Sequence, residues 1–255
     1  ETWFFAATCA QCRKSIRLGH WARGRALPAL LLLATLVSCS ERSTPAAVLY
    51  FVEHEPGAEP YRTRMIVTAG FLRMDGGADS EDFLLFDRAD GTIYSVSSGD
   101  KQILVIRPRP VEIKPPAKFA HRVVTDQAGF PPVDGHKVIH YELLTNEKRC
   151  YDLYAAEGLL PAAVIALREY RLILAGQQAL TLSVMPPEMQ STCDLANNVL
   201  LPARHLEHGF PVRLTDMTGK TMELVDYKTD FRATAAVLRL PADYKRLTLE
   251  DLRGK

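Results

Sequence analysis

Phe71-Leu-Arg-Met-Asp75 and Phe83-Leu-Leu-Phe-Asp87 are two short apolar runs on either side of a Gly-Gly turn signal, and they set the pattern that decides the fold. Arg62-Thr-Arg-Met-Ile-Val-Thr68 precedes them, separated by an Ala-Gly turn signal. Short runs rich in aliphatic and aromatic residues, bounded by turn dipeptides, are typical of β-strands. The other runs of this kind lie at residues 48–52, 92–96 and 102–107. The sequence therefore predicts an antiparallel meander of six strands.

Charged and apolar residues alternate along the second and third of these strands. Arg64 and Arg73, for example, alternate with Met65 and Leu72. Alternation of period two puts apolar side chains on one face of a sheet and charged side chains on the other, in water. The residues that we expect to line an apolar ligand cavity are Met65, Val67, Leu72, Met74, Phe83 and Tyr94. A plain hydrophobic core without a cavity is the alternative for the same positions.

The second half of the chain adds a helical insertion to the sheet. Residues 108–118 hold four prolines and predict an extended connector. Apolar residues at helical spacing predict a helix over 160–182 and a shorter one over 188–200, within an insertion at about 157–205. Further strands are expected at residues 137–144, 149–154, 210–215, 221–227 and 235–240. The expected fold class is therefore α+β, an antiparallel β-meander with a helical insertion.

The N-terminal part of the chain has the layout of a secretory signal. Five basic residues precede an apolar run from Ala26 to Val37, and Ser38 comes directly before Cys39. A helix of this length rises about 18 Å, short of the roughly 30 Å of a hydrocarbon core, so a membrane-spanning segment is disfavoured. Leu36-Val-Ser-Cys39 resembles a bacterial lipobox, which implies that the signal is removed and Cys39 is acylated. An uncleaved signal anchor is the alternative.

The lipobox resemblance sets the expected domains and location. Residues 1–39 would form the signal with its lipobox, residues 40–47 a tether, and residues 48–255 the domain. Ser40 follows the cysteine where an aspartate would imply retention, so the expected location is the cell envelope, on the outer membrane facing the periplasm. The membrane is then a partner through the N-terminal lipid. The dozen residues before the basic cluster are expected to be a fragment edge or the result of a misplaced start.

Net charge and cysteine content narrow the functional classes. Without the signal the chain carries 26 Lys and Arg against 29 Asp and Glu, a net charge of −3, so a nucleic acid is not an expected partner. Cys150 and Cys193 are the only cysteines after Cys39, and in an oxidising envelope such a pair predicts a structural disulfide. Two free buried cysteines are the alternative. Cys9 and Cys12 have C-x-x-C spacing but fall in the part expected to be discarded.

The sequence holds no G-x-S-x-G, no G-x-x-x-x-G-K and no dinucleotide fingerprint, so we expect neither an enzyme nor a cofactor. His136 and His140, and His205 and His208, have spacings that could present two ligands each to a metal, but solvated or hydrogen-bonded surface histidines are the commoner arrangement. The carboxylates at one end of the meander lack the frame of a calcium loop. They are Asp75, Asp79, Glu81, Asp82, Asp87 and Asp90. No catalytic residue or metal site is therefore assigned.

The order of these elements resembles the lipoprotein-carrier superfamily, which sorts outer-membrane lipoproteins. The resemblance rests on the Phe71–Asp75 strand, His208-Gly-Phe-Pro-Val-Arg213, Thr218-Gly-Lys220 and the closing Leu238-Arg-Leu-Pro-Ala-Asp-Tyr244, and covers roughly residues 48–246. It implies a half-barrel around helices, whose concave face binds acyl chains or another apolar segment. Cys39 would place the chain nearer the lipidated receptor than the soluble carrier. The receptor's exposed apolar loop is not identifiable, so neither its activity nor a binding residue is transferred.

Together these features favour a non-catalytic envelope lipoprotein that binds an apolar ligand, such as lipid or lipoprotein acyl chains, in a half-barrel cavity. The alternative is a partner-binding module of an envelope protein complex. That module would have an exposed apolar patch or a free sheet edge rather than an internal cavity. A metal-dependent hydrolase that uses the histidines is the weakest alternative. The volume and lining of any pocket between the sheet and residues 160–200 separate these functions.

Overall fold

The computed structural model describes residues 43–253, apart from 79, 112, 127–129, 187 and 188. The signal, the lipobox and Cys39 lie outside these residues. Residues from Glu41 to Lys255 form one compact unit, with its own hydrophobic core and disulfide, as an independently folding domain has.

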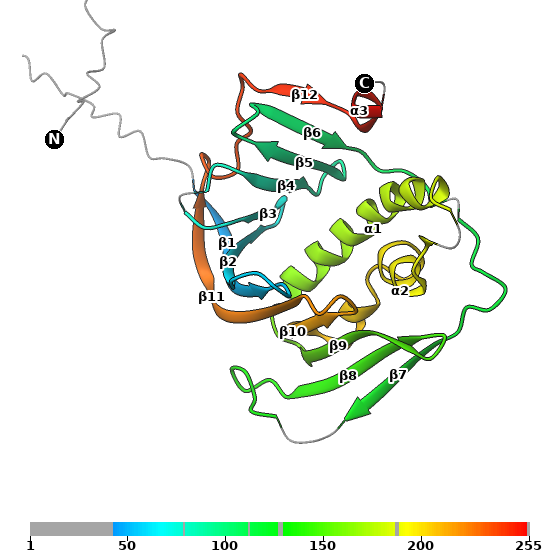
Figure 1. Ribbon diagram of the computed structural model, residues 1–255. Coiled ribbons are helices and arrows are strands. Elements are labelled where there is room, and N and C mark those ends of the chain that lie inside the picture. The colour runs from blue at the N-terminus through cyan, green and yellow to red at the C-terminus, as the bar shows by residue number, and fades with distance from the viewer. Residues whose placement is uncertain (1–42, 79, 112, 127–129, 187–188, 254–255) are drawn as a thin grey trace, which may run out of the picture. The chain divides into compact units, whose positions relative to one another are not determined.

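A single open sheet of twelve described strands makes up most of this unit. Its order is β12-β6-β5-β4-β3-β2-β1-β11-β10-β9-β8-β7, and neighbours are antiparallel except β12 and β6. The strands are β1 (Ser43–His54), β2 (Tyr61–Thr68), β3 (Phe71–Asp75), β4 (Phe83–Asp87), β5 (Thr92–Ser97), β6 (Gln102–Ile106), β7 (His121–Asp126), β8 (Val138–Thr145), β9 (Lys148–Ala156), β10 (Phe210–Asp216), β11 (Thr221–Thr234) and β12 (Lys245–Leu247). The sheet curls around helix α1 (Pro161–Ser183), which lies on its concave side (Figure 1). The predicted α+β class with a helical insertion is confirmed.

The six-strand meander is present, and its first strand is longer than the sequence suggested. β1 begins at Ser43, inside the stretch expected to be a tether, because it pairs on both sides. Ser43 is opposite Thr234 of β11, and Ala46 is opposite Thr68 of β2. Two neighbouring strands satisfy the backbone groups of residues whose small side chains give no strand signal of their own.

The convex face of the meander is covered, contrary to the expectation that it faces water. Residues 235–240, expected to be a strand, are not one: residues 235–238 form turns, and Val237 and Leu238 pack on Val48 and Ile66 of this face. The carbonyl oxygen of Val237 accepts a hydrogen bond from Arg73 Nη1 at 2.8 Å. The segment therefore crosses the face of the sheet, and only β12 further on joins the edge, parallel to β6.

Helix α1 occupies residues 161–183, close to the predicted 160–182. Pro161 is in the first turn, where its missing N–H costs nothing. Ala163 and Ala166 pack into the main core with Leu72 and Phe86 of the sheet. At Gly176 a side chain would collide with the carbonyl oxygen of Arg109, 2.2 Å from the ideal Cβ position. This glycine lets the proline-rich connector pass directly over the helix.

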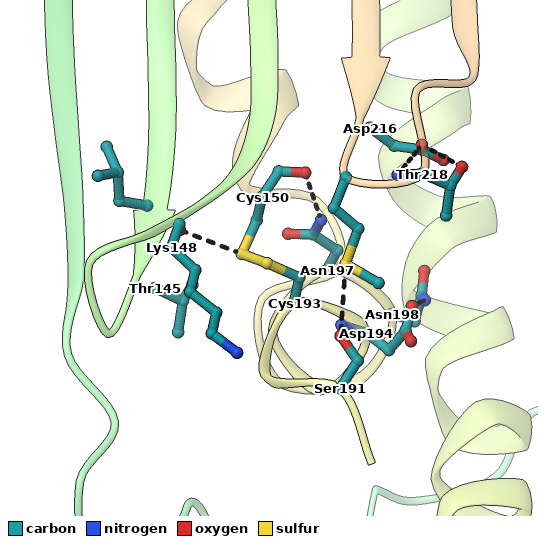
Figure 2. Close-up of a disulfide and its surroundings, with 12 residues drawn as sticks. Thr145, Lys148, Cys150, Ser191, Cys193, Asp194, Asn197, Asn198, Asp216 and Thr218 are labelled. Carbon is teal, nitrogen blue, oxygen red and sulfur yellow. Dashed lines mark hydrogen bonds between the residues drawn. A yellow bond between two sulfur atoms is a disulfide. The ribbon is translucent and has the colours of Figure 1, made fainter. Parts of the chain in front are cut away.

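The second helix, predicted over 188–200, is split into two short elements, α2 (Thr192–Asp194) and the π-helical η2 (Leu195–Leu200). The 3₁₀ helix η3 (Arg204–His208) follows them. The predicted disulfide is formed: Cys193 of α2 is bonded to Cys150 of β9, and Asn197 Nδ2 donates to the Cys150 carbonyl oxygen beside it (Figure 2). The bridge therefore fastens the helical insertion to the sheet.

A last short helix, α3 (Leu249–Arg253), follows β12. Among the described residues, none of the helices combines the length and the hydropathy needed to cross a membrane.

Candidate functional site

A cavity of about 310 Å³ lies between the concave face of the sheet and the helical insertion. Its volume falls at the lower end of the range for small-molecule sites, roughly 300–1,000 Å³. Strands β1, β2, β3, β9, β10 and β11 supply one wall, and α1 and η3 supply the other. The lining residues are Glu53, Met65, Met74, Tyr151, Leu167, Tyr170, Arg171, His205, Leu206, Phe210, Pro211, Leu214, Asp216, Lys220 and Met222.

Three methionines form the floor of this cavity. Met65 and Met74 face each other across the β2–β3 pair, and Met222 comes from β11. Unbranched thioether side chains adapt to differently shaped apolar partners, which suits a wall that contacts a ligand. A second cavity, of about 250 Å³, shares all three methionines and Glu53, and is also lined by Phe51, Thr63, Arg64 and Asp75. The two volumes therefore share one methionine wall.

Four of the six residues predicted to line a cavity lie on the concave face. Met65 and Met74 line the cavity. Val67 and Leu72 are one register pair further along the same face, but they are buried in the core under α1. The prediction of the face was therefore correct for these four, and the helix decides which of them contact the cavity.

The other two, Phe83 and Tyr94, lie on the opposite face, so their assignment was wrong. Met74 is opposite Leu84, whereas Phe83 is opposite Asp75 and Tyr94 is opposite Leu85. Because neighbours along a strand point to opposite faces, Phe83 and Tyr94 point away from the face that holds Met74. The Arg73 guanidinium stacks over the Phe83 ring, 3.7 Å from its centroid, and the Arg246 guanidinium lies 6.0 Å from the Tyr94 ring. Aromatic character does not identify the face of a strand, because only the register does.

An ion-paired cluster stands at the rim of the cavity. Lys220 Nζ lies 2.8 Å from carboxylate oxygens of both Glu53 and Glu55, and 3.0 Å from the Tyr61 hydroxyl. Burial acts to lower the pKa of Lys220, but the hydrogen bonds to these partners outweigh the effect of burial and raise that pKa. The lysine is therefore charged, and its charge is already matched by two carboxylates.

Arg171 of α1 reaches from the helix across the cavity wall to the sheet and to η2. Its Nε donates to the Pro202 carbonyl at 3.2 Å, and its Nη2 donates to the Tyr151 hydroxyl at 3.2 Å and the Asn197 carbonyl at 3.1 Å. All of these acceptors are uncharged. Arg171 lies within the helix predicted over 160–182, but no local pattern indicates a role for it, because these partners come from three separate segments.

His205 is buried in the cavity wall against the Tyr151 ring. Burial, reinforced by the guanidinium groups of Arg171 and Arg204, lowers the pKa of His205 to about 3, so its imidazole is neutral. Its Nδ1 is buried without a hydrogen-bond partner among the described residues. An imidazole in this state is a weak base and a fixed polar group rather than a charged one.

The histidine pairs do not assemble into a metal centre in the described part of the chain. His136 Nδ1 contacts the Glu157 carbonyl at 2.9 Å, and His140 lies between Asp126 and Asp152. His208 stacks on Tyr141, with ring centroids 4.3 Å apart. Across the described residues, His, Cys, Asp and Glu side chains nowhere gather in a group of three that could hold a metal ion.

Comparison with known proteins gives a fold likeness and no family. No protein-family model matches the sequence, and no curated protein matches it. Among solved structures, PNGF-II has a TM-score of 0.41 at 6% identity over 83% of this chain, and MucB a TM-score of 0.37 at 11% identity over 79%. A LolA superfamily protein from Nitrosomonas europaea has a TM-score of 0.25 at 10% identity over 79%.

These likenesses differ in how much of the other protein they cover. The chain spans 33% of PNGF-II and 59% of MucB, against 89% of the LolA superfamily protein. The chain is thus a weak structural neighbour of MucB and of a LolA superfamily protein. At these TM-scores the likeness is too low to transfer a function.

Proposed function

We propose that the protein is an envelope lipoprotein whose described unit binds an apolar ligand, without catalysis, in the cavity between the sheet and α1. The observation that carries the proposal is the cavity itself, with its floor of Met65, Met74 and Met222 and a few fixed polar groups at its rim. A largely apolar concave site with few, well-placed polar groups is the usual form of a small-molecule site. The second cavity, which Phe51 also lines, gives room for an elongated ligand.

Replacing Met74 by tryptophan is expected to fill the cavity and expel the ligand. The 41–255 unit, exported without an acyl anchor and purified without detergent, should show a bound lipid in native mass spectrometry, and Met74→Trp should lose it. Overfilling a packed region costs about 1–3 kcal/mol of unfolding free energy, so the variant should still fold.

Met189→Trp is the matched control, because Met189 is 67% exposed and is not among the residues that line the cavity. It should keep the bound lipid. Detection of the same lipid, in the same amount, on Met74→Trp would remove the cavity as the binding site. An empty wild-type protein that also takes up no added lipid would end the proposal.

The proposed membrane anchor depends on Cys39, which lies outside the described residues. Cells fed an alkyne-tagged fatty acid are expected to label the full chain, and Cys39→Ser should abolish the label and release the protein from the membrane fraction, because the thiol is the site of acylation. Mass spectrometry should find a wild-type chain that begins at Cys39. An unlabelled wild-type chain that retains residues 1–38 would contradict the anchor.

A partner-binding module is the second candidate, and the free sheet edge favours it. Among the described strands, β7 pairs only with β8, so its outer backbone groups are open to an added strand. Val123 on this strand is 41% exposed. If the protein is such a module, Met74→Trp, which fills the cavity, should leave binding of the partner protein in the cell unchanged.

A further inference from the structure

We propose that the cavity selects a single-chain amphiphile with an anionic head group, whose head binds Arg171 and whose chain lies along the methionine floor. The inference rests on the proposed function and names the chemistry of its ligand. A carboxylate or a phosphate would serve as the head, since both accept charge-assisted hydrogen bonds from a guanidinium.

The first observation is that Arg171 has no counter-charge within ion-pair distance among the described residues. Its acceptors are the carbonyls of Pro202 and Asn197, the Tyr151 hydroxyl and the Asn198 side-chain oxygen. Some other arginines that reach into this fold do have one. Arg88, for example, is paired with Glu169 at 2.6 Å. A partly buried guanidinium held only by neutral groups retains its attraction for an anion.

A second buried guanidinium adds to the positive potential. Arg204 is 6% exposed and donates to Asn197 Oδ1, Thr145 Oγ1 at 2.9 Å and the Leu144 carbonyl at 3.4 Å, all neutral. Asn197 therefore serves both arginines, through its carbonyl to Arg171 and its side chain to Arg204. The positive charges of Arg171 and Arg204 both contribute to lowering the pKa of His205.

The carboxylates that line the cavity are already engaged elsewhere. Glu53 is paired with Lys220. Asp216 Oδ1 accepts hydrogen bonds from the backbone N–H groups of Thr218 and Lys220 and from the Thr218 hydroxyl, and so closes the turn between β10 and β11. Among the described residues that line the cavity, Arg171 is therefore the cation without a carboxylate partner, while the Asp216 carboxylate is held by neutral donors at its own turn.

Arg171 also has a free donor. Among the hydrogen bonds of the described residues, its Nε and Nη2 are used and its Nη1 is not. The side chain lines the cavity together with Met65 and Met74, so a head group at Arg171 places the attached chain directly along the methionines. The second cavity, which shares Met65 and Met74 and is also lined by Phe51, adds room for the chain beside them.

Calorimetric titration of the 41–255 unit tests the inference, with dodecanoate and dodecyl phosphate below their micelle concentrations and dodecanol below its solubility limit. The three share one chain and differ in the head. A charge-assisted hydrogen bond supports a preference of roughly tenfold or more for an anionic head over the alcohol. The stronger of the two anions identifies the head as carboxylate or phosphate.

Arg171→Gln should remove this preference and leave dodecanol binding within about twofold, since the glutamine keeps a polar group but not the charge. Arg168→Gln is the matched control: Arg168 lies one turn earlier on α1, with its side chain 53% exposed and 3.9 Å from Glu207, and its loss should leave the preference intact. Arg171→Lys should keep a preference for the anion.

Equal binding of anion and alcohol by the wild-type protein would overturn the inference and leave the apolar site standing. Absence of binding by all three probes would overturn the proposed function itself. If Arg171→Gln does not fold, as judged by its thermal transition, the wild-type comparison and Arg171→Lys decide the matter. A preference that survives Arg171→Gln but is lost in Arg168→Gln would move the head group away from Arg171 and contradict the assignment.

Discussion

Asp75→Asn is expected to destabilise the protein by roughly 3–5 kcal/mol, because it removes the carboxylate that is paired with the buried Arg73 and the partly buried Arg64. The Asp75 side chain is fully buried and accepts hydrogen bonds from Arg64 Nε at 2.9 Å and Nη2 at 2.8 Å, from Arg73 Nε at 2.6 Å, and from the Gly77 N–H at 3.0 Å. Asparagine has one acceptor oxygen and no charge, so two guanidinium groups would remain in the fold without an anion.

Urea unfolding at neutral pH measures this loss of free energy. Asp82→Asn is the control, since Asp82 is exposed at the neighbouring turn and its side chain bonds only to Ser98 in the described structure. Its loss should cost less than about 1 kcal/mol. Equal midpoints for Asp75→Asn and the wild-type protein would show that the cluster contributes no net stability.

The Asp75 carboxylate should also make the unfolding free energy of the protein depend on pH. Burial would raise the pKa of Asp75, but the hydrogen bonds from Arg64 and Arg73 outweigh it and lower that pKa below the ordinary value. A group whose pKa is depressed in the folded state stabilises above its unfolded pKa of about 3.9, and this stability is lost as the pH falls through the folded value. The difference in unfolding free energy between the wild-type protein and Asp75→Asn should therefore narrow below that pH. A difference that stays constant on acidification would contradict this.

Removing the disulfide is the second large change, with an expected cost of about 4 kcal/mol. The bridge joins Cys150 and Cys193, which are 43 residues apart, and a cross-link over a loop of that length restricts the unfolded chain by about this amount in the chain-entropy model. Both cysteines are buried, so the Cys150→Ala/Cys193→Ala double variant adds no polar group to the core. Thermal unfolding of the oxidised wild-type protein and the double variant measures the difference.

Reductant supplies the control for this prediction. It should lower the unfolding temperature of the wild-type protein to near that of the double variant and leave the double variant unchanged. The first region to lose order should be the insertion around Asn197, whose side chain bonds to the Cys150 carbonyl. Hydrogen exchange that rises equally in the β1–β6 meander, far from the bridge, would contradict this local role.

The elements predicted from the sequence are those with a strong local pattern. The helix over 161–183 has apolar spacing and an early proline, and the strands from Phe71 to Ser97 have compact apolar runs between turn signals. Strands without such a pattern were missed. β7 is an exposed edge strand whose only neighbour is β8, and the three residues of β12 are held by β6. Residues 235–240 have strand propensity, but their contacts with the convex face prevent pairing.

The candidate site was predictable only in part. Alternation along β2 and β3 correctly assigned Met65 and Met74 to one face, since side-chain direction follows from strand periodicity. Phe83 and Tyr94 were misassigned because the phase of each new strand depends on the turn before it, and the long turn after Asp75 leaves that phase open. The polar part of the site was missed because Arg171, Tyr151 and Asn197 lie on three different segments.

The sequence by itself determined which segments with a strong local pattern become strands and helix, and which two cysteines were available to pair, because those properties depend on periodicity and composition within short stretches. Only the tertiary structure decided which face of the meander is covered by α1, where the packing leaves space, and which arginines lack a counter-charge. These features depend on contacts between segments far apart in the chain. Arg64 and Arg73 share Asp75, whereas Arg171 is held by neutral oxygens from β9 and η2 and by the carbonyl of Pro202. Burial and pairing are properties of the assembled fold, and no local pattern encodes them.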